Sequence, residues 1–136
     1  MRKILIASHG NMAQGIVHTV SFFAGESNDI AAICAYVGDT PLEDMINEYF
    51  STVKSEDEVI IFTDLLGGSV NRAFLPYLKR EHTHLIAGVN LPMVLEIVLE
   101  PSQYMTTEEV QKIVENGKSS SIYMNNYAIT SDADDE

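Results

Sequence analysis

The stretch KILIASHGNMAQGI, residues 3–16, decides the fold of this chain of 136 residues. Residues 3–8 are a short, largely apolar run that predicts a strand. After Gly10 the sequence changes to helical spacing, and Gly25 can end the helix. The apolar residues with this spacing are Met12, Ala13, Ile16, Val17, Val20 and Phe23. A strand that leads directly into a helix predicts an α/β unit with His9 at the junction.

The same alternation continues along the chain. Residues 30–36 are almost wholly apolar, as expected for a strand covered on both faces. Two more strands are predicted at residues 58–63 (EVIIFT) and 84–89 (HLIAGV), and a short last strand at residues 121–124. Turn and cap residues separate these runs, so the chain predicts strands that alternate with helices.

Cap and breaker residues locate the helices between these strands. Thr40 is the expected N-cap of the second helix, with Pro41 in its first turn and Glu43 closing a capping box. Pro76 is expected to kink or shorten a helix over residues 70–80.

The last two helices have start signals of the same kind. Pro92 opens a helix, and Thr106 with Glu109 forms a second capping box for a helix that ends near Gly117. Strands that alternate with helices imply parallel pairing and right-handed crossovers. The predicted fold is therefore an α/β, doubly wound open sheet, mainly parallel, with helices on both faces.

Length and composition predict one globular domain over residues 1–125, because 136 residues can bury a substantial core. Residues 126–136, which end in SDADDE, form an acidic tail that we expect to be solvated and disordered. The single cysteine, Cys34, lies in an apolar run and is expected to be a small buried hydrophobic residue.

Charge and hydropathy exclude several kinds of partner. The formal net charge of −12 argues against nucleic acid and anionic membranes, which need basic patches. No apolar run approaches the roughly 20 residues that span a bilayer. The apolar run after Lys3 is too short for the core of a signal peptide. We therefore expect a cytoplasmic protein.

Two residues of chemical interest come at the ends of predicted strands. His9 follows the first strand and Asp64 the third, and in a doubly wound sheet these strands are commonly neighbours. Ligand sites of such sheets lie at the carboxyl ends of the strands, near the topological switch point. A carboxylate that accepts a hydrogen bond from one ring nitrogen leaves the other nitrogen free, so His9 is predicted to be a nucleophile or a base.

The residues around this pair are suited to an anion. Gly67, Gly68 and Ser69 precede the third helix, and Gly10 precedes the first. Glycine loops let backbone N–H groups approach an anion, and a helix N-terminus adds positive potential. Each feature alone is common in structural turns, but their combination at one sheet edge favours a functional reading and predicts a phosphoryl group held on His9.

The remaining histidines have weaker signals. His82 and His84 share one face at the start of a strand, but no cysteine or acidic cluster completes a metal site. We expect them to be solvated edge residues, and His18 to be a helix residue without a catalytic role. No metal or other cofactor is predicted.

Three motifs in order carry a resemblance to a known family. They are His9 after the first strand, TDLLGGS (residues 63–69) after the third and AGVNLPM (residues 87–93) at the fourth. Over residues 1–125 the chain resembles the IIA component of the mannose family of the bacterial phosphoenolpyruvate-dependent sugar phosphotransferase system. The resemblance implies that His9 carries the phosphoryl group, that Asp64 orients the imidazole and that Ser69 helps to bind the phosphoryl group.

The sequence departs from the family pattern in the second motif. Val70 follows Ser69 where the family often has proline, and an asparagine comes early, at Asn71. Leu65 stands where some members carry a hydroxyl residue. Asn71 is included among the expected phosphoryl-binding residues, together with the glycines and Ser69.

The resemblance also implies partners and an assembly. The protein would accept a phosphoryl group from phosphorylated HPr and pass it to a IIB component, which serves the membrane IIC and IID components during sugar uptake. Family members form homodimers in which the C-terminal strand is exchanged between subunits. We expect the same of this chain, with its short strand near residues 121–124.

Three other classes share part of the pattern. A histidine phosphatase has its nucleophile after the first strand, but it needs an arginine just before that histidine, where this chain has Ser8. A receiver domain phosphorylated on Asp64 would need an acidic pair after the first strand. The leading alternative is the phosphocarrier subunit of dihydroxyacetone kinase, because it shares the early histidine. It differs from this chain in the second motif.

Overall fold

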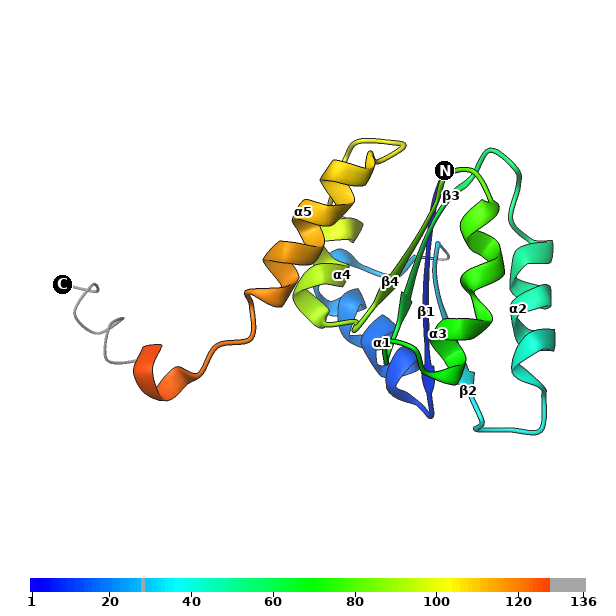
Figure 1. Ribbon diagram of the computed structural model, residues 1–136, viewed down its shortest axis with the longest axis horizontal. Helices are drawn as coiled ribbons and strands as arrows, with labels where there is room; N and C mark the ends of the chain where they lie inside the picture. The colour runs from blue at the N-terminus through cyan, green and yellow to red at the C-terminus, as the bar shows by residue number, and fades with distance from the viewer. Residues whose placement is uncertain (28, 128–136) are drawn as a thin grey trace.

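The computed structural model describes residues 1–27 and 29–127 and contains a four-stranded parallel sheet in the order β2-β1-β3-β4 (Figure 1). The central strands β1 and β3 pair from Arg2 opposite Glu58 to Ala7 opposite Thr63. The predicted neighbourhood of the first and third strands is confirmed. The strands are β1 Arg2–His9, β2 Ile30–Ala35, β3 Glu58–Thr63 and β4 Thr83–Ala87.

Helices cover both faces of the sheet, so the predicted doubly wound fold is confirmed (Figure 1). One face carries α1 Met12–Ala24, α4 Leu91–Val98 and α5 Thr107–Lys118; the other carries α2 Leu42–Ser51, α3 Ser69–Ala73 and the 3-10 helix η1 Leu75–Lys79.

The strands divide their side chains between two cores. In β1, Ile4 and Ile6 pack toward α1, α4 and α5, whereas Leu5 and Ala7 pack toward α2 and α3. This follows from the period of two in a strand, and both faces are apolar because both are covered. Every residue of β3 is buried. Cys34 packs on the α1 side as a small hydrophobic residue, but it is only partly buried rather than buried as predicted.

Several predicted helix boundaries are confirmed. Gly25 ends α1 with φ 77°, and its N–H donates to Ser21. Pro76 divides the predicted third helix into α3 and η1. The capping box of α5 forms, with the Glu109 N–H donating to Thr106 Oγ1 at 3.1 Å and the Thr106 N–H to Glu109 Oε1 at 2.8 Å.

Other boundaries differ from the prediction. The capping box at Thr40 and Glu43 is wrong, because α2 begins at Leu42 and its N-cap Pro41 accepts no side-chain cap bond. Proline has no side-chain oxygen with which to cap, and Pro41 has an extended ψ of 144°, so the helix starts after it. The second strand ends one residue early, because Tyr36 turns the chain with φ 66°.

The C-terminal segment does not form the predicted strand. Residues 121–123 have no regular secondary structure, and residues 124–127 make a helical turn that lies away from the sheet (Figure 1). An isolated strand has no partner for its backbone N–H and C=O groups, so a single chain gives this segment no reason to be extended. Residues 128–136 of the expected acidic tail lie outside the described residues.

An ion pair joins the amino ends of the central strands. Arg2 Nε donates to Glu58 Oε1 at 2.7 Å, and the Met105 N–H donates to Glu58 Oε2 at 2.6 Å. The Arg2 guanidinium also donates to the carbonyls of Glu100 and Ser102 in the loop before α5. Because the Glu58 side chain is fully buried and has both oxygens engaged, this network attaches the loop to the sheet.

Candidate functional site

The site lies at the carboxyl ends of the strands, where three loops meet. His9 ends β1, Tyr36 follows β2, and Asp64 and Ser69 come from the loop between β3 and α3. The chain leaves β1 toward one face of the sheet and β3 toward the other, so this is the topological switch point at which doubly wound proteins bind ligands.

His9 and Asp64 make a direct pair, as the sequence predicts. Asp64 Oδ2 lies 2.8 Å from His9 Nδ1 and also accepts the His9 backbone N–H at 2.8 Å. The other carboxylate oxygen accepts the Leu65 N–H at 2.9 Å. Burial opposes ionisation of Asp64, but the hydrogen bonds from His9 and Leu65 outweigh it and lower the pKa of Asp64. The carboxylate is therefore held ionised beside the imidazole.

This pairing defines which ring nitrogen is available. An ionised carboxylate only accepts hydrogen bonds, so Nδ1 of a neutral His9 carries the proton and Nε2 carries the lone pair. The His9 side chain is 42% exposed, whereas that of Asp64 is 10% exposed. The orienting group is thus sheltered, and the ring that it orients is open to a partner.

Ser69 and Tyr36 complete the polar contacts of the ring. Ser69 Oγ lies 3.3 Å from His9 Nε2, as the predicted role of Ser69 requires. The Tyr36 hydroxyl lies 2.8 Å from Ser69 Oγ, and the tyrosine ring lies 5.4 Å from the imidazole, centroid to centroid. Tyr36 was not among the site residues predicted from the sequence. Its signal was present, because Tyr36 directly follows an apolar strand at the same edge of the sheet.

The first two glycines of the site serve the backbone rather than a ligand. Gly10 and Gly67 have φ 63° and 76°, in the left-handed region that other residues rarely adopt. The Gly10 N–H donates to the Ala35 carbonyl at 2.9 Å, and the Gly67 N–H donates to Asn71 Oδ1 at 3.1 Å. In this conformation both N–H groups are engaged within the protein.

Gly68 keeps the loop close to the histidine. Its N–H donates to the Leu65 carbonyl at 3.1 Å and is also engaged. A Cβ added at Gly68 would lie 3.3 Å from the Cβ and carbonyl oxygen of Leu65 and 3.7 Å from His9 Cε1. An added Cβ would be tight against Leu65 and in ordinary contact with the ring, so the glycine allows the loop to fold closely on itself beside His9.

Asn71 holds the loop between β3 and α3 from the buried side. Its side-chain amide donates to Thr63 Oγ1 at 2.9 Å and accepts the Gly67 N–H, and the residue is only 6% exposed. Both ends of the amide are therefore occupied inside the protein. The expected direct contact between Asn71 and a phosphoryl group does not fit this geometry.

Ser8 and the helix starts shape the rest of the edge. The buried Ser8 hydroxyl accepts the Ala13 N–H at 2.8 Å and so fixes the first turn of α1 behind His9. On the other side, α3 opens at Ser69, and the N–H groups of a first helical turn have no partner inside the helix. The reactive ring thus lies beside one occupied and one open helix start.

The other histidines do not join this site. His84 Nε2 lies 3.2 Å from the Met105 carbonyl oxygen, and the His82 ring stacks on Tyr104 with centroids 3.8 Å apart. Both therefore hold the loop before α5. In the part of the chain that the structure describes, no three histidine, cysteine or acidic side chains come together as a metal site.

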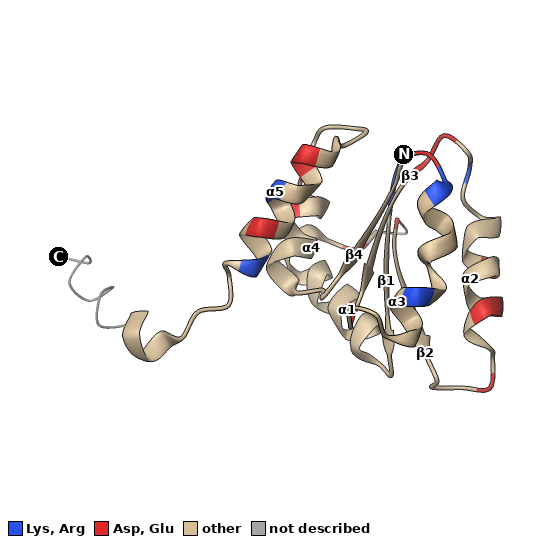
Figure 2. Ribbon diagram, in the orientation of Figure 1, with Lys and Arg blue, Asp and Glu red and all other residues tan. Residues whose placement is uncertain are grey.

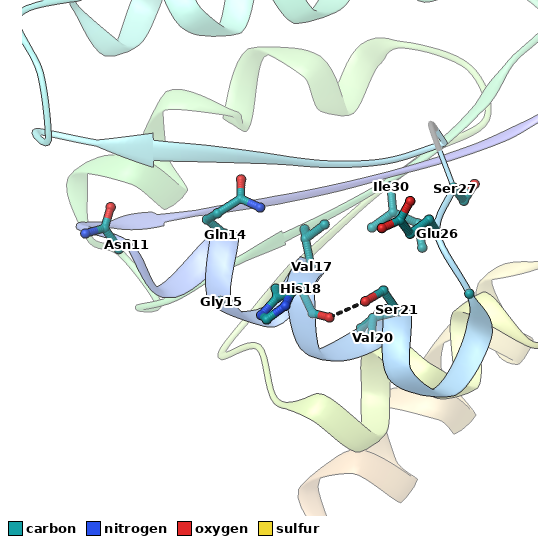
Figure 3. Close-up of a pocket in the computed structure, with 11 residues that line it drawn as sticks. Asn11, Gln14, Gly15, Val17, His18, Val20, Ser21, Glu26, Ser27 and Ile30 are labelled. Atoms are coloured by element: carbon teal, nitrogen blue, oxygen red, sulfur yellow. Dashed lines mark hydrogen bonds between the residues drawn. The ribbon is translucent and has the colours of Figure 1, made fainter.

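A surface groove lies away from His9 and Asp64. A groove of about 570 Å³ runs beside α1 toward the start of β2 and is lined by Gln14, His18, Ser21 and Glu26, among others (Figure 3). Neither His9 nor Asp64 lines it. The contacts of His9 and Asp64 therefore place the candidate site at the open edge of the sheet and not in this groove.

Charge near the site is sparse. Figure 2 shows Asp and Glu on α2 and α5 and few Lys or Arg along the ribbon, one of them on α3. The basic residue of α3 is Arg72, in its last turn. No described helix is both long and apolar enough to cross a bilayer.

Fold and site together define a class of protein. This is a doubly wound α/β domain that presents an aspartate-oriented histidine on an open sheet edge. The model of the family described as phosphotransferase system fructose IIA component, EIIA-man, matches residues 3–115. The chain belongs to this family and is a IIA component of a sugar phosphotransferase system, as the resemblance implied.

Two curated relatives agree with this assignment. The phosphotransferase system fructose-specific EIIA component of Bacillus subtilis is 25% identical over 101 residues, 72% of this chain and 69% of that protein. The mannose-specific EIIAB component of Escherichia coli K12 is 29% identical over 120 residues, 85% of this chain. The alignment spans only 37% of that longer relative.

Solved structures are similar over nearly the whole chain. A Klebsiella pneumoniae protein described as a phosphoenolpyruvate-dependent sugar phosphotransferase system permease has a TM-score of 0.86 and 32% identity, covering 93% of both chains. The IIA protein associated with the fucose utilization operon of Streptococcus pneumoniae has a TM-score of 0.79 and 27% identity, covering 93% of this chain and 96% of its own. These similarities favour the sugar phosphotransferase role over the phosphatase and dihydroxyacetone kinase alternatives.

Proposed function

We propose that this protein is a cytoplasmic phosphocarrier that accepts a phosphoryl group on His9 from phosphorylated HPr and passes it to a IIB component. The observation that carries the proposal is the 2.8 Å contact between Asp64 Oδ2 and His9 Nδ1, which leaves Nε2 as the free nucleophile on a ring 42% exposed. The proposed transfer invokes no metal or other cofactor.

The transfer needs only two imidazoles and an anion site. The Nε2 lone pair of His9 attacks the phosphorus of phospho-HPr, a P–N bond forms on His9, and the P–N bond to the HPr imidazole breaks. The proton on Nδ1 stays in place, so the His9 ring gains positive charge as the bond forms. The ionised Asp64 stabilises that charge, and the reverse sequence delivers the phosphoryl group to IIB.

Ser69 and α3 are proposed to hold the phosphoryl oxygens. Ser69 Oγ already lies near Nε2, and the first-turn N–H groups of α3 add donors and positive potential. In this proposal Gly10, Gly67 and Gly68 act by shaping the loops. Asn71 acts by holding the loop between β3 and α3, because its amide is occupied by Thr63 and Gly67.

Exposed apolar side chains around His9 support a protein partner rather than a small substrate. Such patches are typical of surfaces that dock other proteins. They surround a shallow site, and a partner's histidine has to approach Nε2 directly. HPr and IIB would use this surface in turn, and the membrane IIC and IID components would be reached only through IIB. The patch consists of Met12, Tyr36, Val37, Leu65 and Leu66, each about half exposed or more.

A homodimer is the second part of the proposal. β4 is an edge strand, and a groove of about 530 Å³ lies between it and α5. The C-terminal segment carries apolar side chains that are exposed in the single chain: Ile122, Tyr123, Met124 and Tyr127. Addition of this segment to β4 of a second copy would cover both surfaces and give the segment strand partners.

Truncation tests the dimer. A chain ending at Gly117 should be monomeric or aggregate, whereas the full chain should sediment as a dimer in analytical ultracentrifugation. The matched control carries Ser119→Ala and Ser120→Ala, which leave the apolar side chains in place and should remain dimeric. A truncated protein that stays a well-folded dimer would contradict the exchange.

The phosphoryl linkage tests the carrier function. With phosphoenolpyruvate, the first enzyme of the system, HPr and Mg²⁺, the protein should gain one phosphoryl group per chain, acid-labile and alkali-stable. His9→Ala should abolish the labelling, and His18→Ala, at an exposed histidine of α1, should not. Labelling that persists in His9→Ala, or a hydroxylamine-sensitive bond, would reject the proposal.

A further inference from the structure

The hydroxyl of Tyr36 lies in a short chain of hydrogen bonds that ends on the reactive nitrogen of His9. Tyr36 Oη lies 2.8 Å from Ser69 Oγ, and Ser69 Oγ lies 3.3 Å from His9 Nε2. On the far side of the ring, Nδ1 lies 2.8 Å from Asp64 Oδ2. Four side chains, from the end of β1, the residue after β2 and the segment between β3 and α3, are therefore linked through one imidazole.

The available protons determine which group donates in each of these hydrogen bonds. Asp64 is ionised and can only accept, so a neutral His9 has its proton on Nδ1 and accepts at Nε2. The single Ser69 proton is then directed at Nε2. Ser69 Oγ still has acceptor capacity, and the Tyr36 O–H is the donor within reach. Tyr36 thus fixes the rotation of the Ser69 hydroxyl, which could otherwise turn away from the ring.

The backbone at Tyr36 indicates that this placement is maintained against strain. Tyr36 has φ 66°, a left-handed conformation that bulky residues rarely adopt. The preceding residue, Ala35, accepts the Gly10 N–H at 2.9 Å, which ties the end of β2 to the loop after His9. Tyr36 is 61% exposed, so core packing does not account for a tyrosine in this conformation.

We propose that Tyr36 is a positioning residue for phosphoryl transfer, which acts through Ser69 by aiming its hydroxyl at Nε2 before transfer and at the phosphoryl group after it. Once phosphorus occupies Nε2, the Ser69 proton has no acceptor on the ring and turns to a phosphoryl oxygen, while Tyr36 continues to donate to Ser69. The inference rests on the proposed carrier function, because it assigns Ser69 a transferring group to hold.

The kinetic test uses Tyr36→Phe, which removes the hydroxyl and keeps the ring. The maximal rate of His9 phosphorylation by phospho-HPr should fall about fivefold, the value of one neutral hydrogen bond, with the KM for phospho-HPr unchanged. In a Ser69→Ala background the same substitution should have no further effect. Tyr104→Phe, which loses a hydroxyl contact to the Glu56 carbonyl at the opposite end of the sheet, is the matched control.

Each other kinetic outcome overturns the assignment. A raised KM with an unchanged maximal rate would mean that the Tyr36 hydroxyl, and not only its ring, serves partner docking and does not aim Ser69. A full fivefold loss in the Ser69→Ala background would show that Tyr36 does not act through Ser69. A wild-type rate in Tyr36→Phe would remove Tyr36 from the mechanism.

A second measurement does not depend on phosphorylation. In ¹⁵N NMR of the unphosphorylated protein at a pH where His9 is neutral, Tyr36→Phe should move the His9 Nε2 resonance toward its position in Ser69→Ala and leave Nδ1 unchanged. If the wild-type protein is never labelled, the carrier function fails while this measurement still decides the role of Tyr36. An unmoved Nε2 resonance would refute the positioning role even in a protein that carries phosphate.

Discussion

The same two strands carry a close side-chain pair at each end of the sheet, and the two pairs differ in almost every other respect. Arg2 and Glu58 begin β1 and β3, whereas His9 ends β1 and Asp64 follows β3. At the amino end the Glu58 side chain is fully buried and its oxygens bind Arg2 and the loop before α5. At the carboxyl end the histidine is exposed and keeps one nitrogen without a charged partner.

The difference shows how one geometry can serve stability or chemistry. Both pairs have a side-chain contact of 2.7–2.8 Å to a carboxylate oxygen. A buried pair with every acceptor occupied resists change, because removal of either partner leaves an unpaired charge in the interior. In the other pair, the sheltered Asp64 instead orients the exposed His9 and so directs its reactivity. The amino end therefore stabilises the fold, and the carboxyl end presents the proposed nucleophile.

Loss of charge at the amino end should give the largest effect. Glu58→Gln leaves Arg2 facing a neutral amide in a buried site, and we expect the free energy of unfolding to fall by about 3 kcal/mol. Urea denaturation measures the change, and Glu56→Gln, at a neighbouring exposed residue, is the control. The rate of His9 phosphorylation in the folded fraction should not change. A slowed transfer would mean that the two ends are coupled.

The corresponding change at the carboxyl end should affect transfer more than stability. Asp64→Asn keeps the shape of the side chain but removes the charge that orients and stabilises the His9 ring. We expect phosphorylation of His9 to slow by at least about tenfold with the fold intact. Rapid-quench kinetics and circular dichroism measure the two properties. A wild-type transfer rate in Asp64→Asn would exclude the carboxylate from the mechanism.

Low pH should remove stabilising contributions at both ends of the sheet. The Lys54 N–H is the main group that lowers the pKa of Asp57, beside the amino-end pair, and the bonds from His9 and Leu65 lower the pKa of Asp64 against its burial. A lowered carboxyl pKa stabilises the fold above the unfolded value near 4, and this contribution disappears as the pH falls through the lowered pKa.

The expected result is a free energy of unfolding that is nearly constant above about pH 5 and declines below about pH 4. Asp57→Asn and Asp64→Asn should each flatten the decline, as measured by denaturation at a series of pH values. Asp39→Asn, on an exposed loop, should leave the decline as it is. If neither Asp57→Asn nor Asp64→Asn flattens the decline, these two carboxylates do not cause the loss of stability in acid.

The smallest effect concerns the strained backbone at the carboxyl end. Tyr36→Gly should raise the free energy of unfolding by about 0.5–1 kcal/mol, because glycine adopts φ 66° without a Cβ clash. The neighbouring Val37→Gly should lower it, because Val37 is not in that conformation. Chemical denaturation compares the two variants. A destabilised Tyr36→Gly would mean that the side-chain contacts of Tyr36 outweigh its strain.

Much of the fold could be predicted because local patterns carried it. The bounds of β3 and the capping box of α5 follow from apolar runs and cap residues within a few positions of each other. The pairing of His9 with Asp64 followed from the general topology of doubly wound sheets. The failures at Thr40 and at residues 121–124 arose where a local signal competed with the surrounding chain: Pro41 displaced the cap, and the last segment had no strand beside it.

The sequence by itself determined the order of the elements, the two apolar faces of the sheet and the presence of a histidine and an aspartate at the ends of neighbouring strands. These properties depend on periodicity and on residues close along the chain. Only the tertiary structure decided that the glycine N–H groups and the Asn71 amide are already occupied and that Tyr36 reaches Ser69 from a different loop. Hydrogen-bond partners in folded proteins are set by where loops meet in space, and three loops distant in sequence meet at His9.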